Sequence, residues 1–122
     1  GINGNSYSIV SGCTITGHPG TGVSLISGVV ENCTIAGPTG NGGVSVVRNS
    51  IVRNCNIENV FTGVFVELDG VRIEGNNLRG VTNGMDCAGG GNIVIRNTFR
   101  NVTTPLIGAG NIFGVLRTTF AL

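Results

Sequence analysis

The sequence predicts an all-β solenoid, a parallel β-helix of about five to six coils with about 21 residues per coil. Three observations predict this fold class. A short block of residues recurs along the chain at a nearly constant spacing, and glycine or asparagine follows each of the first five copies at a fixed place. No stretch shows the 3.6-residue hydrophobic period of a helix.

The repeated block ends on a large apolar residue, and its copies are spaced by 20, 22, 21, 21 and 21 residues. Five positions earlier, every copy carries a β-branched apolar residue. The first column contains Ile15, Ile35, Ile57, Leu78, Phe99 and Phe120, and the second contains Val10, Val30, Val52, Ile73, Val94 and Val115. Stacked coils would place each column as a ladder in the interior, with about 4.8 Å between coils.

Two positions after the large apolar residue of the first five copies, only glycine and asparagine occur. This column contains Gly17, Gly37, Asn59, Gly80 and Asn101. Because these residues adopt positive φ at low cost, the column predicts one left-handed turn per coil. A second strand follows each turn, as in Gly43-Val44-Ser45-Val46, where apolar and other residues alternate. The leucine-rich repeat has a similar period but needs regularly spaced Leu and a helical half, which this chain lacks.

Composition limits the classes of partner. Charged residues make up 11% of the chain, all seven basic residues are Arg, and the net charge is +1. Such a chain has no general field that attracts nucleic acid or an anionic membrane, so we expect neither partner. We expect a single domain over residues 1–122, either a mature form or a module of a longer protein.

The pattern Val-x-Asn-Cys-x-Ile-x-Gly at residues 30–37, with Gly-Val-x-Val following at residues 43–46, resembles a known repeat. It is similar to the right-handed single-stranded parallel β-helix repeat of pectate lyases, polygalacturonases and phage tailspikes. The resemblance covers nearly the whole chain and implies right-handed coils and a secreted, extracellular protein. It is specific for the fold and not for an activity, because the repeated residues belong to the scaffold.

Several conspicuous residues are expected to be structural. Cys13, Cys33 and Cys55 share one inward column, where a thiol acts as a small hydrophobic group. Asn76 and Asn97 continue that column and are expected to form an amide ladder between coils. Cys87 is expected in the core, and His18 in a solvent-exposed turn. No metal site is expected from the cysteines, because ladder side chains point in one direction and do not converge.

The first candidate surface lies on the second strand. Phe65 should point outward between Val64 and Val66, with Ser45 and Asp86 as its column neighbours and Glu67 and Asp69 nearby. An exposed ring can stack on a sugar while carboxylates bind its hydroxyls. Two alternatives stay open for Glu67, Asp69 and Asp86: glycosidase chemistry or a weak Ca²⁺ site. A third is that these charges only keep the solenoid soluble.

The second candidate surface contains Glu58, Arg79 and Arg100, which follow the Ile ladder on successive coils. Cross-strand ion pairs are the favoured interpretation, and binding of an acidic polysaccharide is the alternative. Arg96 and Arg117 share another outward column, with Arg53, Arg72 and Glu74 close by. Apolar residues in outward columns, such as Ile9 and Ile26, predict that the domain forms a homo-oligomer, for example a trimer, or packs on a neighbouring domain.

The function that these observations favour is a non-catalytic polysaccharide-binding or adhesion module. The first alternative is a structural or receptor-binding segment of a phage tailspike or fibre. The second is a polysaccharide lyase or glycoside hydrolase. Catalysis ranks below binding because every loop is short and leaves little room for a cleft, and no lyase motif matches residue by residue. No cofactor is expected apart from the Ca²⁺ alternative.

Overall fold

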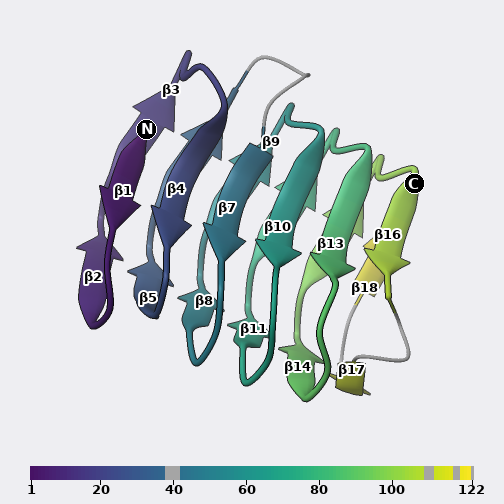
Figure 1. The fold of residues 1–122 in the computed structure, drawn as a ribbon. Helices are drawn as coiled ribbons and strands as arrows, with labels where there is room; N and C mark the ends of the chain where they lie inside the picture. The colour runs from purple at the N-terminus through teal and green to yellow at the C-terminus, as the bar shows by residue number, and fades with distance from the viewer. Residues whose placement is uncertain (38–41, 109–111, 117–118, 122) are drawn as a thin grey trace.

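The chain winds into a stack of parallel coils with its two ends at opposite ends of the stack (Figure 1). The computed structural model describes residues 1–37, 42–108, 112–116 and 119–121, with side chains for the first two ranges. Every strand pairs in parallel with the equivalent strand of the next coil, with a spacing of about 21 residues. The predicted parallel solenoid is confirmed. Within the described ranges there is no helix that could span a membrane.

Each coil contributes three strands, whereas the sequence suggested two. The three resulting sheets have six strands each. Sheet A contains β1 (Ile2–Gly4), β4 (Thr21–Leu25), β7 (Gly42–Val46), β10 (Thr62–Val66), β13 (Asn83–Cys87) and β16 (Thr104–Ile107). Sheet B contains β2 (Ser8–Ser11), β5 (Gly28–Glu31), β8 (Ile51–Arg53), β11 (Arg72–Glu74), β14 (Asn92–Ile95) and β17 (Ile112–Leu116). Sheet C contains β3 (Thr14–Thr16), β6 (Thr34–Ala36), β9 (Asn56–Glu58), β12 (Asn77–Arg79), β15 (Thr98–Arg100) and β18 (Thr119–Ala121).

The extra corner lies inside the repeated block, between sheets B and C. One residue per coil has positive φ there and turns the chain. These residues are Gly12, Asn32, Asn54, Gly75 and Arg96, with φ between 53° and 67°. Because glycine and asparagine tolerate this conformation, the corner needs no longer loop. The block therefore forms two short strands separated by a sharp turn.

The corner between sheets C and A is the turn that the sequence predicted. Gly17, Asn59, Gly80 and Asn101 all have positive φ. Gly37 does not, so the prediction is wrong for this coil. A Cβ at Gly37 would lie only 2.7 Å from Cε1 of His18. Glycine is therefore required there by lack of space and not by a positive φ.

His18 is buried, and the expectation of an exposed turn residue is wrong. Its side chain is 3% exposed, and its Nε2 lies 3.0 Å from the carbonyl oxygen of Gly42. The ring packs beside Gly22 and Gly37, whose missing side chains leave room for it. The imidazole therefore fills the interior near the N-terminal end of the stack.

The core is a set of ladders along the axis. Ile35, Ile57, Leu78 and Phe99 stack on sheet C and are almost completely buried. The β-branched ladder of sheet B and the valines of sheet A face them across the interior. Each buried aliphatic side chain contributes about 1.5–3 kcal/mol relative to an exposed one. Stacking is what makes the burial possible, because one coil alone leaves its inward face open.

The inward column of thiols and amides connects successive coils. The Nδ2 of Asn76 donates to the carbonyl of Val52 at 2.9 Å and to Oδ1 of Asn97 at 3.0 Å. The Sγ of Cys55 lies 3.8 Å from the carbonyl of Val30, the equivalent acceptor one coil earlier, and 3.3 Å from the carbonyl of Arg53 in its own coil. The predicted amide ladder is confirmed, and all four cysteines are free thiols.

We expect the stability of the fold to fall in alkaline solution. Burial raises the pKa of the Cys55 and Cys87 thiols from 9.0 to about 11. Between these values the unfolded chain releases thiol protons that the folded chain retains, so rising pH favours unfolding. The contribution of these two thiols to stability should be fully present below pH 9 and should decrease as the pH rises towards 11. The measurement is the midpoint of urea unfolding as a function of pH. The double variant Cys55→Ala, Cys87→Ala should lose most of this dependence, and an equal slope in both proteins would contradict the assignment.

Candidate functional site

The outward face of sheet A carries the first candidate surface. In β10, Val64 and Val66 point into the core, so Phe65 points outward and is half-buried. The parallel register places Phe65 between Ser45 of β7 and Asp86 of β13. Both neighbours are half-buried as well. The structure thus brings three of the five predicted residues into one row across three coils, here called the Phe65 row.

The other two predicted residues lie outside the Phe65 row. Glu67 is exposed and follows β10, where its backbone N–H donates to the carbonyl of Val46 at 3.0 Å. Asp69 lies further on, in the turn before β11, and its backbone carbonyl accepts from the N–H of Asn49 at 3.0 Å. In the described part of the chain, no three His, Cys, Asp or Glu side chains are grouped so that they could hold a metal ion. The geometry therefore gives no support to a Ca²⁺ site of Glu67, Asp69 and Asp86.

Two exposed apolar side chains border the Phe65 row, and the sequence analysis did not identify them. Phe61 is 48% exposed immediately before β10, and Leu68 is 40% exposed after it. The sequence did contain a signal for these two residues. Both are apolar but lie outside the columns that stack in the core, so no interior ladder can bury them. Their side chains widen the apolar part of this surface.

The second candidate surface lies on sheet C. The register aligns Glu58, Arg79 and Arg100 on three successive coils, as predicted. A hollow of about 200 Å³ lies beside them. It is lined by Thr34, Asn56, Ile57, Glu58, Asn77 and Arg79. Glu58, Arg79 and Arg100 form no ion pair among the described side chains, so the favoured interpretation is wrong for this row. The expected pairing of Arg and Glu on adjacent coils does occur on sheet B, between Arg53 and Glu31.

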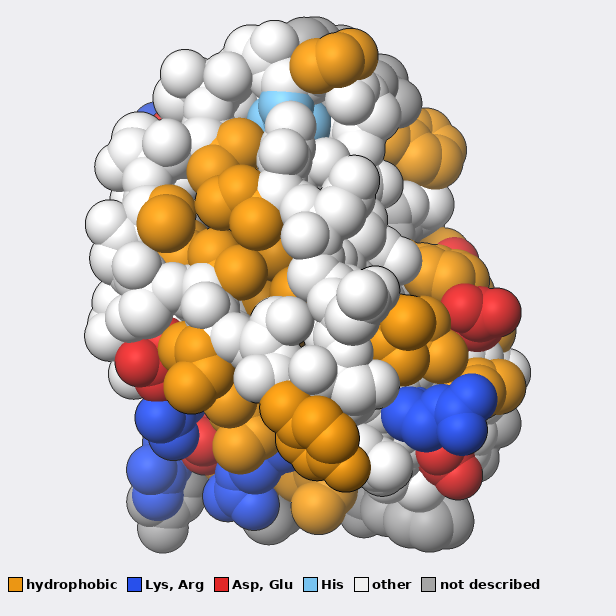
Figure 2. Space-filling model, turned by 60° about the vertical axis from the view of Figure 1, so that its left-hand side comes forward, with side chains coloured by type: hydrophobic (Ala, Val, Ile, Leu, Met, Phe, Trp, Pro, Cys, Tyr) orange, Lys and Arg blue, Asp and Glu red, His pale blue; other side chains and the backbone are white. Residues whose placement is uncertain are grey.

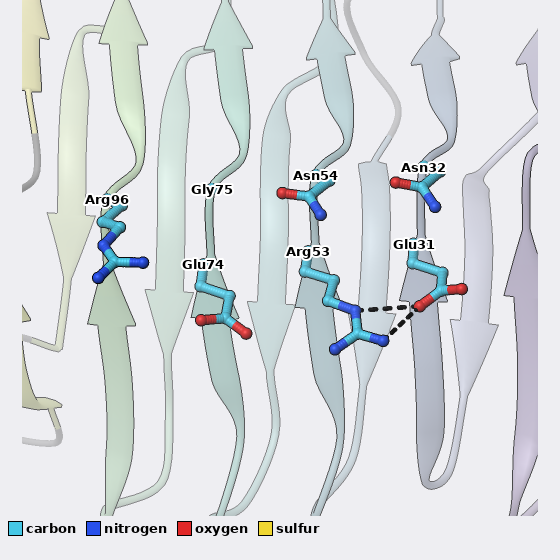
Figure 3. A pocket seen from close by; sticks show the side chains of 7 residues that line it. All are labelled: Glu31, Asn32, Arg53, Asn54, Glu74, Gly75 and Arg96. Carbon is cyan, nitrogen blue, oxygen red and sulfur yellow. Dashed lines mark hydrogen bonds and ion pairs between the residues drawn. The ribbon is translucent and has the colours of Figure 1, made fainter.

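A polar groove of about 480 Å³ lies at the corner between sheets B and C and is here called the corner groove (Figure 3). It is lined by Glu31, Asn32, Arg53, Asn54, Glu74, Gly75 and Arg96. Arg53 donates from Nε and a terminal nitrogen to one oxygen of Glu31, at 3.0 and 2.7 Å. This contact, with a further hydrogen bond from Ser11, holds the pKa of Glu31 below its ordinary value. The Nε of Arg72 lies 3.1 Å from Glu74.

Sequence reasoning placed Arg53, Glu74 and Arg96 near one another but did not predict this groove. The signal was present in the column of Gly12, Asn32, Asn54, Gly75 and Arg96, which repeats the Gly and Asn pattern of the predicted turn. Arg117 of the predicted Arg96 column lies outside the described residues.

The first coil presents a partly apolar surface. It carries a hollow of about 540 Å³ lined by Gly1, Ile2, Cys13, Thr14, Ile15, Thr16 and His18. Figure 2 turns this end of the molecule towards the viewer and shows hydrophobic side chains gathered in its middle. On the same coil, Tyr7 is 94% exposed and Ile9 is 69% exposed.

Fold and surface together define a parallel β-solenoid domain with polar and aromatic rows on its outer faces. Residues 1–110 match the family model of the right handed beta helix region. The chain therefore belongs to the right-handed β-helix family, which confirms the resemblance and the handedness of the coils. Comparison with curated proteins and with solved structures gave no match.

Proposed function

We propose that this domain is a non-catalytic carbohydrate-binding or adhesion module of a secreted protein, with the Phe65 row as its binding surface. The observation that carries the proposal is the register of sheet A, which sets an outward ring between a hydroxyl and a carboxylate. The face of a sugar ring is apolar and its edge carries hydroxyls. An aromatic side chain can stack on the face while Ser45 and Asp86 bind hydroxyls at the edge.

The repeat suits a polymer better than a single sugar. Successive coils lie about 4.8 Å apart, which is close to the length of one pyranose unit. A linear polysaccharide that crosses the strands of sheet A meets Ser45, Phe65 and Asp86 in turn. Short strands and tight corners leave this face open, so a long chain can lie on it without threading.

Binding fits the row better than catalysis. Glycosidases place two carboxyl groups on either side of the scissile bond, about 5–9.5 Å apart. The Phe65 row holds one carboxylate, Asp86, while Glu67 follows the strand in the next outward column and Asp69 lies in the corner turn. The row therefore offers one hydrogen-bonding carboxylate beside a ring.

Replacing Phe65 with alanine should weaken binding to the polysaccharide that the domain recognises. Loss of the stacked ring removes an aromatic contact worth about 1–2 kcal/mol, so we expect affinity to fall roughly tenfold or more. The measurement is affinity electrophoresis of the purified domain in gels that contain single neutral or acidic polysaccharides. Mobility is compared with that in a gel without polymer.

Tyr7→Ala is the matched control, because it removes an exposed aromatic ring from the first coil, outside sheet A. It should retain retardation, and both variants should keep the thermal midpoint of the parent. Equal retardation of the parent and the Phe65→Ala variant would contradict this site. If no polymer retards the parent, the proposal fails, and the exposed Tyr7 and Ile9 favour a structural, oligomeric segment instead.

A further inference from the structure

Two arginines lie side by side on the outward face of sheet C. Arg79 of β12 is the register partner of Arg100 of β15. The backbone N–H of Gly80 donates to the carbonyl of Arg100 at 3.0 Å, and that of Asn59 donates to the carbonyl of Arg79 at 3.1 Å. These hydrogen bonds hold the neighbouring backbones about 4.8 Å apart. The two side chains therefore leave the sheet next to each other, and the backbone cannot move to separate them.

This arrangement is unfavourable unless something neutralises the charges. Like charges directly opposite each other on paired strands are destabilising. Both side chains are exposed, and among the described residues neither forms an ion pair, although Glu58 is the register partner of Arg79 on the preceding coil. The two guanidinium groups are therefore available to a ligand with negative charge.

The hollow beside Arg79 offers polar groups to the rest of such a ligand. Its volume is about 200 Å³, and Thr34, Asn56, Glu58 and Asn77 are among the residues that line it. The Nδ2 of Asn77 donates to Oδ1 of Asn56 at 3.4 Å. Because a side-chain amide carries two N–H groups, Asn77 has a second donor for a ligand. The hollow therefore suits a small group that carries hydroxyls.

The charge and shape of the arginine pair favour a phosphate group over a carboxylate. A carboxylate has two oxygens and a single charge, so it matches the donor fork of one guanidinium. A phosphate monoester carries a charge of about −1.5 to −2 at pH 7 and has three strong acceptor oxygens. One phosphate group can therefore accept from both forks and neutralise both arginines.

We propose that Arg79 and Arg100 bind the phosphate group of a small polar phosphate monoester. The two guanidinium groups bind the phosphate oxygens, and the organic part of the ligand lies in the hollow. There the amide of Asn77 donates to a ligand hydroxyl, and the carboxylate of Glu58 accepts from one. The site lies on sheet C and shares no residue with the Phe65 row, so it does not rest on the function proposed above.

The test compares Arg100→Gln with the parent domain. Glycerol 3-phosphate is titrated at low ionic strength, which is held constant with chloride, and binding is followed by the phosphorus-31 chemical shift. The parent should saturate, and the variant should bind roughly tenfold more weakly or worse. Without ligand, the variant should keep or exceed the thermal midpoint of the parent, because the substitution removes the repulsion between the two arginines. Inorganic phosphate should bind the parent more weakly than the ester, and equal affinities would overturn the role of the hollow.

Arg48→Gln is the matched control for net charge, because it removes another exposed arginine that lies away from sheet C, between β7 and β8. It should retain the affinity of the parent for glycerol 3-phosphate. Acetate, titrated as a competitor, should displace the ester only at a concentration at least tenfold higher than that of inorganic phosphate. The proposal is overturned by unchanged affinity in Arg100→Gln, by equal losses in both variants or by equal competition from acetate and phosphate. It is also overturned if the parent shows no saturable binding, whatever the result for Phe65→Ala.

Discussion

Replacing Gly63 with alanine should destabilise the domain by about 3 kcal/mol, a large part of the total stability of a domain this size. Gly63 belongs to an inward column of sheet A with Gly22, Gly43 and Gly84. A Cβ at Gly63 would collide with Cδ2 of Leu78 and lie 2.7 Å from the carbonyl oxygen of Gly84. The backbone of β13 cannot move away, because it is paired on both sides within sheet A.

The variant Gly17→Ala shows whether the loss of stability in Gly63→Ala comes from lack of space or from backbone strain. Gly17 has a φ of 62°, and a Cβ there meets nothing within 4 Å. Its replacement should cost only the strain of a left-handed alanine, about 1 kcal/mol. Both costs are measured as the free energy of unfolding in urea. If Gly63→Ala costs no more than Gly17→Ala, the glycine column is not set by packing against the ladder of sheet C.

The inner architecture was predictable because every coil repeats it. Ile57 and Leu78 could be assigned to one ladder from their spacing alone. The period-two alternation of the strand was enough to predict that Phe65 points outward. Parallel in-register pairing then fixes its neighbours without further information, which is why Ser45 and Asp86 were assigned correctly to its row. Where a feature recurs in each coil, the sequence supplies several independent copies of the same signal.

Features that belong to one coil were not predictable in this way. His18 occurs once, so no column shows whether its ring points inward, and the space beside Gly22 and Gly37 that receives it depends on two coils. The corner between sheets B and C was not predicted, because Asn32 and Asn54 lie inside a block whose sequence pattern is typical of one continuous strand. The corner groove depends on which ion pairs form. That depends on the side-chain rotamers of Arg53 and Arg72, which the sequence pattern does not specify.

The second large effect is expected at Asn76, where alanine should cost about 3 kcal/mol. Its Oδ1 accepts from the backbone N–H of Cys55 at 3.0 Å, and its Nδ2 donates to the carbonyl of Val52 at 2.9 Å. Asn76 is 1% exposed, so water cannot replace the lost amide without entering the core. Each buried polar group left without a partner costs about 1–3 kcal/mol.

The variant Asn76→Cys separates the donor role of the amide from its acceptor role. It introduces at position 76 the residue type that occupies this column one coil earlier, at Cys55. The Sγ of Cys55 lies 3.8 Å from the carbonyl of Val30, so a thiol at residue 76 should approach the carbonyl of Val52 in the same way. The variant lacks the acceptor for the N–H of Cys55 and the amide donor to Oδ1 of Asn97, but that oxygen still accepts from the backbone N–H of residue 76 at 2.9 Å. We therefore expect it to lose about half as much stability as Asn76→Ala in urea unfolding. Equal losses in the two variants would show that the thiols of this column are simple space-filling groups. A smaller loss for cysteine would show that Cys33, Cys55 and Asn76 perform one task, which is to bind the backbone of each coil to the coil before it.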